Sequence, residues 1–155
     1  MGKSVNRVRQ AAQAAGLEIE IITLPTSAHT AQDAADSCGC SVGQIAKSMI
    51  FEGAQSGNLM LILVSGAHQL DLDRAPNLFG EALVRADPKR VRAETGFAIG
   101  GVAPIGHLCD MQTYIDAALL EFETVWGAGG APETVFEISP QDLLKATRAI
   151  PFTNK

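Results

Sequence analysis

The chain has 155 residues, of which 46% are hydrophobic and 19% charged, a balance typical of a globular domain rather than a disordered or membrane-spanning chain. A formal net charge of −5 argues against a protein that coats nucleic acid through bulk electrostatic attraction. The odd count of three cysteines suits a reducing compartment, and no apolar run is long enough to span a bilayer. We therefore expect a single cytoplasmic domain over 1–155 that uses no membrane, metal or cofactor.

Apolar periodicity, capping residues and turn residues predict that helices and strands alternate in the first part of the chain. The elements expected there are a helix over 4–15, a strand over 18–24, a helix over 31–38, a short helix over 42–46 and a strand over 47–52. The elements expected later are a strand over 59–64, a helix over 71–78, a strand over 82–86, a helix over 88–95, a strand over 107–112, a helical turn over 116–120, strands over 123–126 and 134–138, and a helix over 141–149.

The run over 59–64 is apolar throughout, which predicts a strand buried on both faces at the centre of the sheet. Some predicted strands follow one another directly, while others are separated by helices. This order argues against a wholly parallel, doubly wound sheet. We therefore expect an α/β (α+β) fold with a mixed β-sheet and flanking helices.

A glycine-rich segment in the middle of the chain is its most distinctive motif. It contains Gly100, Gly101 and Gly106, has Pro104 between them and ends at His107. Glycine permits a ligand to approach the main chain, and proline stiffens it, so such a loop can direct several N–H groups at a phosphate, carboxylate or oxyanion. The same pattern is also ordinary turn punctuation between two strands. It matches neither the dinucleotide-binding nor the P-loop pattern, so we expect neither site.

Lys47 stands where a predicted helix gives way to an apolar strand. A lysine beside buried surface can hold a phosphate or carboxylate, or act as an amine of lowered pKa. The alternative is a lysine whose stem is buried at the strand end while its ammonium reaches solvent.

The other candidates for chemistry are histidines, a cysteine and a second glycine cluster. His107 could serve as acid or base near neutral pH or be held structurally by a hydrogen bond, whereas we expect His29 and His68 to be exposed loop residues. Cys109 has no acidic or basic partner beside it, and no serine lies in a G-x-S-x-G motif. The cluster over 127–130 reads alone as a hairpin turn, and it could also face the first glycine segment across a cleft.

Taken in order, several segments resemble the YbaK/EbsC family of aminoacyl-tRNA deacylases, also called the prolyl-tRNA synthetase-associated domain. The resemblance is carried by Ile-Ala-Lys-Ser over 45–48 followed by Gly-Gly-x-x-Pro-x-Gly-His over 100–107. It begins near Thr30 and continues to Leu143, so it covers nearly the whole chain. It implies a mixed, strongly curved β-sheet packed with helices.

The resemblance also implies an activity, the hydrolysis of the ester bond of a mischarged tRNA, since a synthetase cannot reject a near-isosteric amino acid by binding alone. The lysine would hold the 3′-terminal adenosine, and the main chain of the glycine loops would shape the pocket and stabilise the oxyanion. Water, or the hydroxyl or thiol of the substrate, would be the nucleophile. This accounts for the absence of a recognisable catalytic triad in the sequence. The catalytic residues expected are Lys47, Gly100, Gly101 and His107. The substrate-binding residues expected are Ser48, Pro104, Gly106, Gly127, Gly129 and Gly130.

The expected partner is the acceptor end of a mischarged tRNA, such as Ala- or Cys-tRNA(Pro), and a synthetase partner or a homodimer is compatible with the sequence. Some members of the family carry a histidine in or beside the second glycine turn, but residues 127–131 contain none, which leaves the amino acid open. Two other functions also stay open. One is a module that binds a tRNA end or another nucleotide without hydrolysis, and the other is a small ester or amide hydrolase that uses His107 and Cys109.

Overall fold

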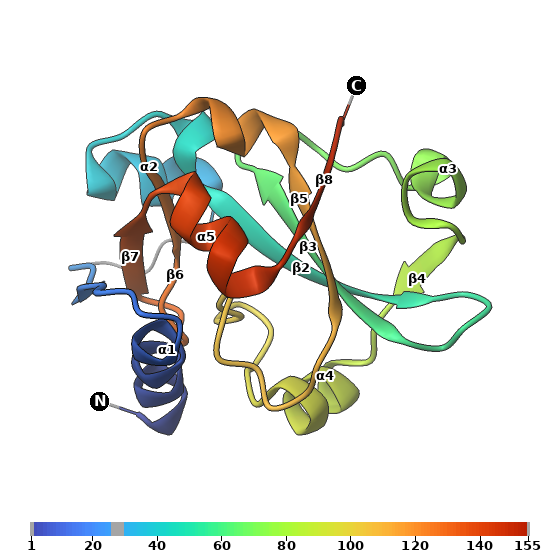
Figure 1. The fold of residues 1–155 in the computed structure, drawn as a ribbon, viewed down its shortest axis with the longest axis horizontal. Coiled ribbons are helices and arrows are strands. Elements are labelled where there is room, and N and C mark those ends of the chain that lie inside the picture. Colours follow the sequence, from blue (N-terminus) through green and yellow to red (C-terminus); the bar gives the residue numbers. More distant parts are fainter. Residues whose placement is uncertain (1, 26–29, 155) are drawn as a thin grey trace.

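The computed structural model describes residues 2–25 and 30–154, and Figure 1 shows how their helices and strands are arranged. The α-helices are α1 (Lys3–Ala14), α2 (Ala31–Cys38), α3 (Ala75–Phe79), α4 (Pro88–Thr95) and α5 (Pro140–Thr147). The short 3₁₀ helices are η1 (Val42–Gln44), η2 (Leu72–Arg74) and η3 (Ala117–Glu121). The strands are β1 (Ile21–Thr23), β2 (Ala46–Gly53), β3 (Leu59–Ser65), β4 (Leu83–Arg85), β5 (Gln112–Asp116), β6 (Val125–Ala128), β7 (Thr134–Ile138) and β8 (Ile150–Phe152).

The described strands form two sheets. The smaller one is antiparallel, with the order β1-β7-β6, and the larger one has the order β4-β2-β3-β5-β8. In the larger sheet β2 is antiparallel to both neighbours, whereas β3, β5 and β8 run parallel. An isolated bridge between Ile45 and Trp126 connects the start of β2 to β6. The predicted mixed fold with flanking helices is confirmed, with its strands divided between two sheets instead of one.

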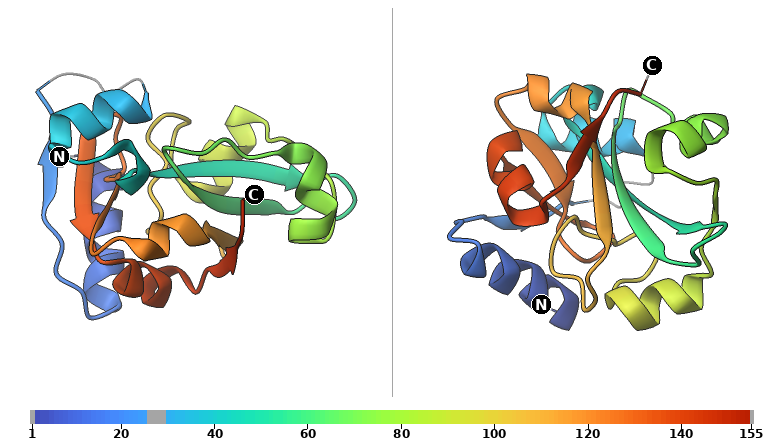
Figure 2. Two further views of the ribbon diagram at one scale, coloured as in Figure 1. Left: turned by 90° about the horizontal axis from the view of Figure 1, so that it is seen from above. Right: turned by 45° about the vertical axis from the view of Figure 1, so that its right-hand side comes forward.

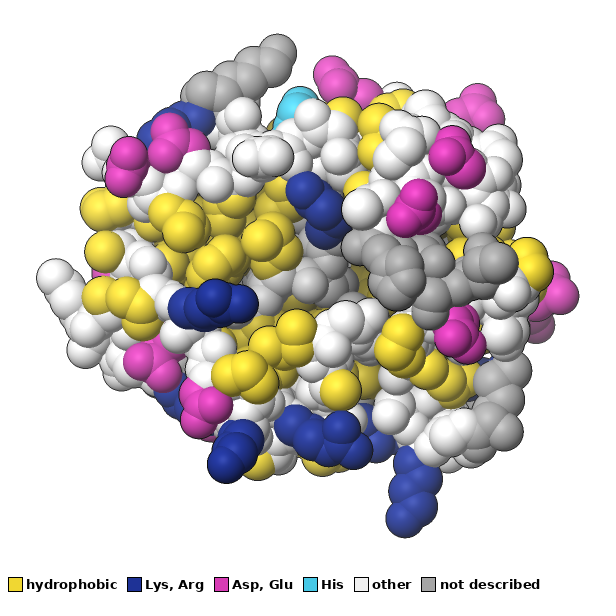
Figure 3. Space-filling model, turned by 180° about the vertical axis from the view of Figure 1, so that it is seen from behind, with side chains coloured by type: hydrophobic (Ala, Val, Ile, Leu, Met, Phe, Trp, Pro, Cys, Tyr) yellow, Lys and Arg dark blue, Asp and Glu magenta, His cyan; other side chains and the backbone are white. Residues whose placement is uncertain are grey.

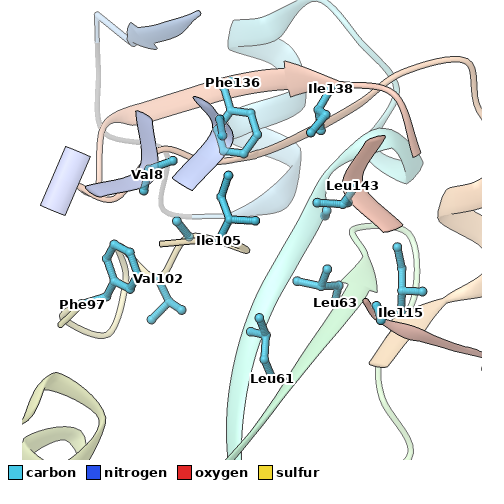
Figure 4. Packing of buried hydrophobic residues seen from close by; sticks show 14 of the residues in the cluster. Val8, Leu61, Leu63, Phe97, Val102, Ile105, Ile115, Phe136, Ile138 and Leu143 are labelled. Carbon is cyan, nitrogen blue, oxygen red and sulfur yellow. The ribbon is translucent and has the colours of Figure 1, made fainter. Parts of the chain in front are cut away.

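Strand β3 lies at the centre of the molecule and separates two hydrophobic clusters. All seven of its residues are buried, as the apolar run predicts. Leu61 and Leu63 face the cluster that includes residues of α1, α5 and the smaller sheet, which Figure 4 shows from close by. Ile62 and Val64 belong to a second cluster that packs against α3. The side views in Figure 2 show α3 at the far end of the long β2–β3 hairpin from the smaller sheet.

Several helix ends follow from capping residues. Helix α2 has the predicted bounds, and the hydroxyl oxygen of Thr30 accepts a hydrogen bond from the Asp33 N–H at its start. The Ser139 hydroxyl oxygen likewise accepts one from the Asp142 N–H at the start of α5. The N-cap of α1 is Gly2, so the helix begins at Lys3, one residue before the predicted start at 4.

Two predicted elements near the C-terminal half need correction. The strand expected over 107–112 does not form, and β5 begins only at Gln112, because the chain before it is bent at 104–105 and 108–109 and the His107 ring bonds to the Ala103 carbonyl. The last helix ends at Thr147 instead of continuing to 149. Arg148 has a φ of 55°, which ends the helix and lets the chain add β8, a strand that the sequence did not predict.

The surface combines apolar and charged regions. Figure 3 shows one face, on which hydrophobic side chains gather in a band and Lys and Arg side chains lie across its middle and lower part. Asp and Glu side chains in this view lie mainly toward its margins and its right-hand part. None of the described helices is long and apolar enough to cross a membrane.

Candidate functional site

A cavity of about 340 Å³ lies where the start of β2 meets the smaller sheet. Its walls come from α2, from the start of β2, from the first glycine segment and from β6 and β7. The residues that matter most for its chemistry are Ala31, Lys47, Ser48, Gly100, Val102, Trp126 and Gly127. The site therefore assembles segments that are up to about a hundred residues apart in sequence.

The cavity lies beside a stretch of β2 that has a strand on only one side. Its neighbour β3 pairs with β2 from Ala46 to Glu52, whereas β4 pairs only with Phe51 to Gly53. Ahead of that point, the isolated bridge between Ile45 and Trp126 is the one strand pairing that the described residues make on the other edge. Side chains on successive strand positions point to opposite faces of a sheet. Since no strand pairs with β2 along this edge, residues from both faces of the strand, Lys47 and Ser48, can line the same cavity.

Lys47 is half-buried, and its ammonium is held in a defined place. The Nζ atom donates a hydrogen bond to the His68 carbonyl oxygen at 2.7 Å. Burial lowers the pKa of Lys47, and the buried carboxylate of Asp116 opposes that shift. An ammonium has three donors. Two of them remain for an anion or a carbonyl oxygen in the cavity.

Ser48 contributes a second polar group. Its Oγ atom is buried and has no hydrogen-bond partner among the described residues. A buried hydroxyl without a partner costs free energy, which a bound polar ligand would recover. The Thr134 hydroxyl, also in the cavity wall, is already occupied by the main chain of Ala131.

The two residues at the head of the first glycine segment have different environments. Gly100 is exposed with a φ of 96°, lines the cavity, and its N–H has no hydrogen-bond partner within residues 2–25 and 30–154. The N–H of Gly101 instead donates to the Ala98 carbonyl at 2.9 Å. A Cβ added at Gly101 would lie 3.3 Å from the main chain of Ala131, so this glycine serves close packing between loops. Of these two residues, Gly100 is the one that lines the cavity.

The two glycine segments touch each other directly at Pro104 and Gly127, and both also line the cavity, through Gly100 and Gly127. A Cβ added at Gly127 would lie 3.2 Å from the Pro104 side chain. Gly127 lines the cavity, and Pro104 supports it from outside the lining. The proline thus fixes the position of the cavity wall, because no side chain separates it from β6.

Three of the glycines predicted to bind substrate lie outside the cavity lining and pack against the N-terminal part of the chain. An added Cβ would lie 3.0 Å from the Val8 nitrogen at Gly106, 2.7 Å from the Ile21 side chain at Gly129 and 2.9 Å from the Ser4 oxygen at Gly130. These glycines hold the loops against α1 and β1. The nearness of main-chain atoms at Gly106 and Gly130, and of the Ile21 and Thr134 side chains at Gly129, explains the residue type without a ligand.

His107 also lies outside the cavity. Its Nε2 atom bonds to the Ala103 carbonyl at 2.7 Å, and because a carbonyl only accepts, Nε2 carries the proton. Its ring packs edge-on against Phe97 at 5.0 Å, and Nδ1 is buried without a partner among the described residues. Burial lowers the pKa of His107 to about 4. The imidazole is therefore neutral at physiological pH and holds the bend of the glycine segment.

This burial predicts a pH dependence of stability. The His107 imidazole is protonated below about pH 6.5 in the unfolded chain but only below about pH 4 in the folded one. Between these values the unfolded chain binds the extra proton, so acid should lower the free energy of unfolding by up to ~1.4 kcal/mol per pH unit. Urea unfolding of wild type and His107→Gln from pH 7 to pH 4 should show a smaller slope in the variant. If the free energy of unfolding depended on pH equally in the two proteins, the assignment of this dependence to His107 would be wrong.

The comparison with known proteins decides the family. Residues 26–146, more than half of the chain, match the aminoacyl-tRNA editing domain. The chain belongs to this family. YwhH of Bacillus subtilis (strain 168) is 33% identical over 126 residues, which are 81% of this chain and 80% of YwhH. EbsC of Enterococcus faecalis (strain ATCC 700802 / V583), described as a proposed Cys-tRNA(Pro)/Cys-tRNA(Cys) deacylase, is 26% identical over 119 residues, 76% of this chain and 72% of EbsC.

A solved structure is also similar over the whole chain. It is described as a proposed trans-editing enzyme for prolyl-tRNA synthetase, is 42% identical and has a TM-score of 0.92, covering 100% of this chain and 98% of that one. The editing-domain fold is therefore shown both by the family match and by the structural likeness.

The side chains around the cavity limit the chemistry that this editing domain can perform there. Among the described residues that line it, Lys47 is the one side chain that can carry a charge, and none is a cysteine, histidine or carboxylate. In the described part of the chain no three His, Cys, Asp or Glu side chains come together as metal ligands do. The cavity offers hydrogen-bond donors and a positive charge, which suit the binding of an ester and the stabilisation of an oxyanion.

The structure brings the two residues of the alternative hydrolase site to one pocket, but among the described residues their side chains do not form a hydrogen-bonded pair. His107 and Cys109 line one shallow pocket, yet Nε2 is bonded to Ala103 and Nδ1 makes no hydrogen bond within the described residues. Burial, the largest cause, raises the pKa of the Cys109 thiol. A thiol nucleophile needs a lowered pKa or an adjacent base. The geometry of this editing domain supplies neither to Cys109.

Sequence reasoning missed two residues beside the cavity. His68 was expected to be an exposed loop residue, but its ring is only 30% exposed and its Nδ1 lies 2.8 Å from Asp116 Oδ2. That expectation is wrong because the turn after β3 folds back onto the end of β5. No local signal in the sequence marks the pair, because Asp116 ends a segment of mixed polarity, Gln112–Asp116, and lies 48 residues from His68. His29 lies outside the described residues.

Proposed function

We propose that this editing domain hydrolyses the ester bond of a mischarged aminoacyl-tRNA in the cavity beside β2. The observation that supports it best is the combination of an anchored ammonium, a buried hydroxyl without a partner and an unpaired main-chain N–H around one space. These groups bind and polarise an ester without attacking it. In this proposal residues 1–155 act as one editing domain.

In the proposed mechanism Lys47 holds the 3′-terminal adenosine, with one proton on the His68 carbonyl and the others directed at the substrate. The N–H of Gly100 donates to the ester carbonyl oxygen as it becomes an oxyanion. A water molecule attacks the carbonyl carbon, the bond to the ribose oxygen breaks, and the proton lost by the water goes to that oxygen, which gives the free amino acid and the uncharged tRNA. If the hydroxyl or thiol of the substrate attacks instead, its proton goes to the ribose oxygen and the amino acid leaves as a cyclic ester or thioester.

The remaining predicted residues receive different roles in this proposal. Ser48 contacts the aminoacyl group, and Gly127 leaves room for it in the wall that Pro104 supports. Gly101 and Gly106 shape the loop that carries Gly100. His107 acts as a structural residue at the end of that loop. Gly129 and Gly130 hold the second loop against β1 and α1.

The proposed substrate is a tRNA that carries a small wrong amino acid, such as Ala- or Cys-tRNA(Pro). A cavity of about 340 Å³ holds part of an aminoacyl adenosine and leaves little room for a large side chain. The names of EbsC and of the similar solved structure support a link to cysteine and to prolyl-tRNA synthetase. We propose a cytoplasmic enzyme that contacts the acceptor end and acts alone, beside a synthetase or as a homodimer.

The deciding experiment measures release of labelled amino acid from Ala-tRNA(Pro), Cys-tRNA(Pro) and correctly charged Pro-tRNA(Pro). Hydrolysis of one mischarged species at a rate well above the spontaneous rate, with Pro-tRNA(Pro) spared, is the expected result. Binding of these tRNAs without any hydrolysis would instead favour a recognition module. The absence of a cysteine, histidine or carboxylate among the described cavity residues is the observation that keeps this second function open.

A further inference from the structure

A buried carboxylate lies near Lys47 but outside the cavity lining. Asp116 ends β5, its side chain is 1% exposed, and both of its oxygens accept hydrogen bonds. Oδ2 accepts from the Ser65 N–H at 3.2 Å and bonds to His68 Nδ1 at 2.8 Å, and Oδ1 accepts from the Ala118 N–H at 3.0 Å. Burying a carboxylate is costly unless it is fully hydrogen-bonded, and these partners meet that requirement.

The bonds of Asp116 fix the turn that follows β3. Both ends of that turn, Ser65 and His68, are attached to the same carboxylate oxygen. The turn is closed by a bond from the His68 N–H to the Ser65 carbonyl at 2.9 Å. The carbonyl of His68 is the group that accepts the bond from Lys47 Nζ. A continuous path of hydrogen bonds and covalent bonds therefore runs from Asp116 through His68 to Lys47.

The charges around Lys47 come from few groups. No other described residue in the cavity wall carries an ionisable acid or base, so the charged neighbours lie on the side of the turn after β3. They are Asp116, His68 when protonated, and Glu121, which lines a small pocket together with both of them. Burial lowers the pKa of Lys47, and the Asp116 carboxylate raises it. Without that carboxylate, burial would lower the pKa of Lys47 further.

We propose that Asp116 is a positioning residue for Lys47, because through His68 it fixes the carbonyl oxygen that holds the lysine ammonium at the cavity. The consequence for catalysis rests on the proposed deacylase function. The link between Asp116 and Lys47 does not, and it can be measured without a substrate.

The first test follows the ammonium directly. The chain has five lysines, so NMR of selectively labelled lysine side chains gives few signals, and Lys47→Arg identifies the one that belongs to Lys47. The pKa of Lys47 should be lower in Asp116→Asn than in wild type. Glu121→Gln is the matched control, since it removes a nearby exposed charge and leaves the bonds from Asp116 through His68 to Lys47 intact. It should change the pKa of Lys47 less than Asp116→Asn does. Equal pKa values of Lys47 in wild type and both variants would overturn the proposal.

The second test measures deacylation of the mischarged tRNA that wild type hydrolyses. Asp116→Asn should reduce kcat by at least about tenfold, because a displaced catalytic group loses its orientation toward the substrate. Activity needs the ammonium, so it falls as pH rises through the pKa of Lys47, and this loss should begin at a lower pH in the variant. A reduced kcat with an unchanged pH profile would overturn the positioning role and indicate a merely structural one.

His68→Ala keeps the test decisive if Asp116→Asn does not fold. This variant retains the His68 carbonyl and leaves Asp116 bonded to the Ser65 and Ala118 N–H groups. It should lower kcat, whereas the pKa of Lys47 should change less than in Asp116→Asn, because the carboxylate that raises it is retained. An unchanged kcat in a folded His68→Ala protein would overturn the proposal. If wild type hydrolyses no tRNA, the proposed function fails, and the NMR titration still decides the role of Asp116.

Discussion

Replacing Lys47 by Ala should lower deacylation of the mischarged tRNA by about 100-fold while leaving the fold intact. A hydrogen bond from a charged group contributes about 1.5–3 kcal/mol, which corresponds to roughly 10-fold to 150-fold in rate. The side chain is half-buried at an open strand edge and its loss frees only one carbonyl, that of His68. The thermal unfolding midpoint should therefore change little. Labelled amino acid release and calorimetry measure the two effects.

Two further variants give this experiment its controls. Lys89→Ala removes an exposed lysine of α4 and the same formal charge, so it shows the effect of net charge on tRNA binding alone. Lys47→Arg retains the charge but replaces a compact ammonium by a planar guanidinium, and it should recover only part of the activity. Full activity in Lys47→Ala would remove this residue from the site.

Replacing Gly130 by Ala should lower the free energy of unfolding by about 3 kcal/mol, through backbone strain and crowding together. Gly130 has a φ of 106°, a conformation that residues with a side chain rarely adopt. An added Cβ would also lie 2.9 Å from the Ser4 carbonyl oxygen in the first turn of α1. For a chain of this size the midpoint of thermal unfolding should fall by roughly 10 °C.

Gly100→Ala is the matched control for Gly130→Ala. Its φ of 96° is similar, but an added Cβ would meet nothing within 4 Å among the described atoms. It should therefore show the backbone cost alone and a smaller loss of stability than Gly130→Ala. Equal losses in the two variants would mean that the contact with α1 contributes nothing.

Much of the local structure follows from short-range signals. The bounds of α2 and α4 are set by caps and by glycines after their ends, and these residues are recognisable without tertiary contacts. The burial of β3 follows from an apolar run that no polar residue interrupts. The division of the strands into two sheets is different, since it depends on which distant segments pair, and it could not be derived from periodicity.

The candidate site shows even more clearly which features cannot be derived from the sequence. Lys47 and Gly100 stand out in the sequence by residue type, and the structure places both at one cavity. The glycines at 106, 129 and 130 look the same in the sequence, yet they pack against α1 and β1. Glycine is needed equally for the approach of a ligand and for the approach of another main chain. Asp116 remained hidden because its importance comes from partners about 50 residues away.

The open edge of β2 also bears on association between copies of the protein. A strand with unpaired main-chain groups is a template on which a strand of another molecule can add. In the stretch between the Ile45 bridge and the pairing with β4, Lys47 places a charged side chain at that edge. Lysine at an exposed strand edge opposes such addition, because a second strand would have to bury the ammonium. In the proposal, an apolar replacement such as Lys47→Val therefore removes a charge from this strand edge together with the contact to the substrate.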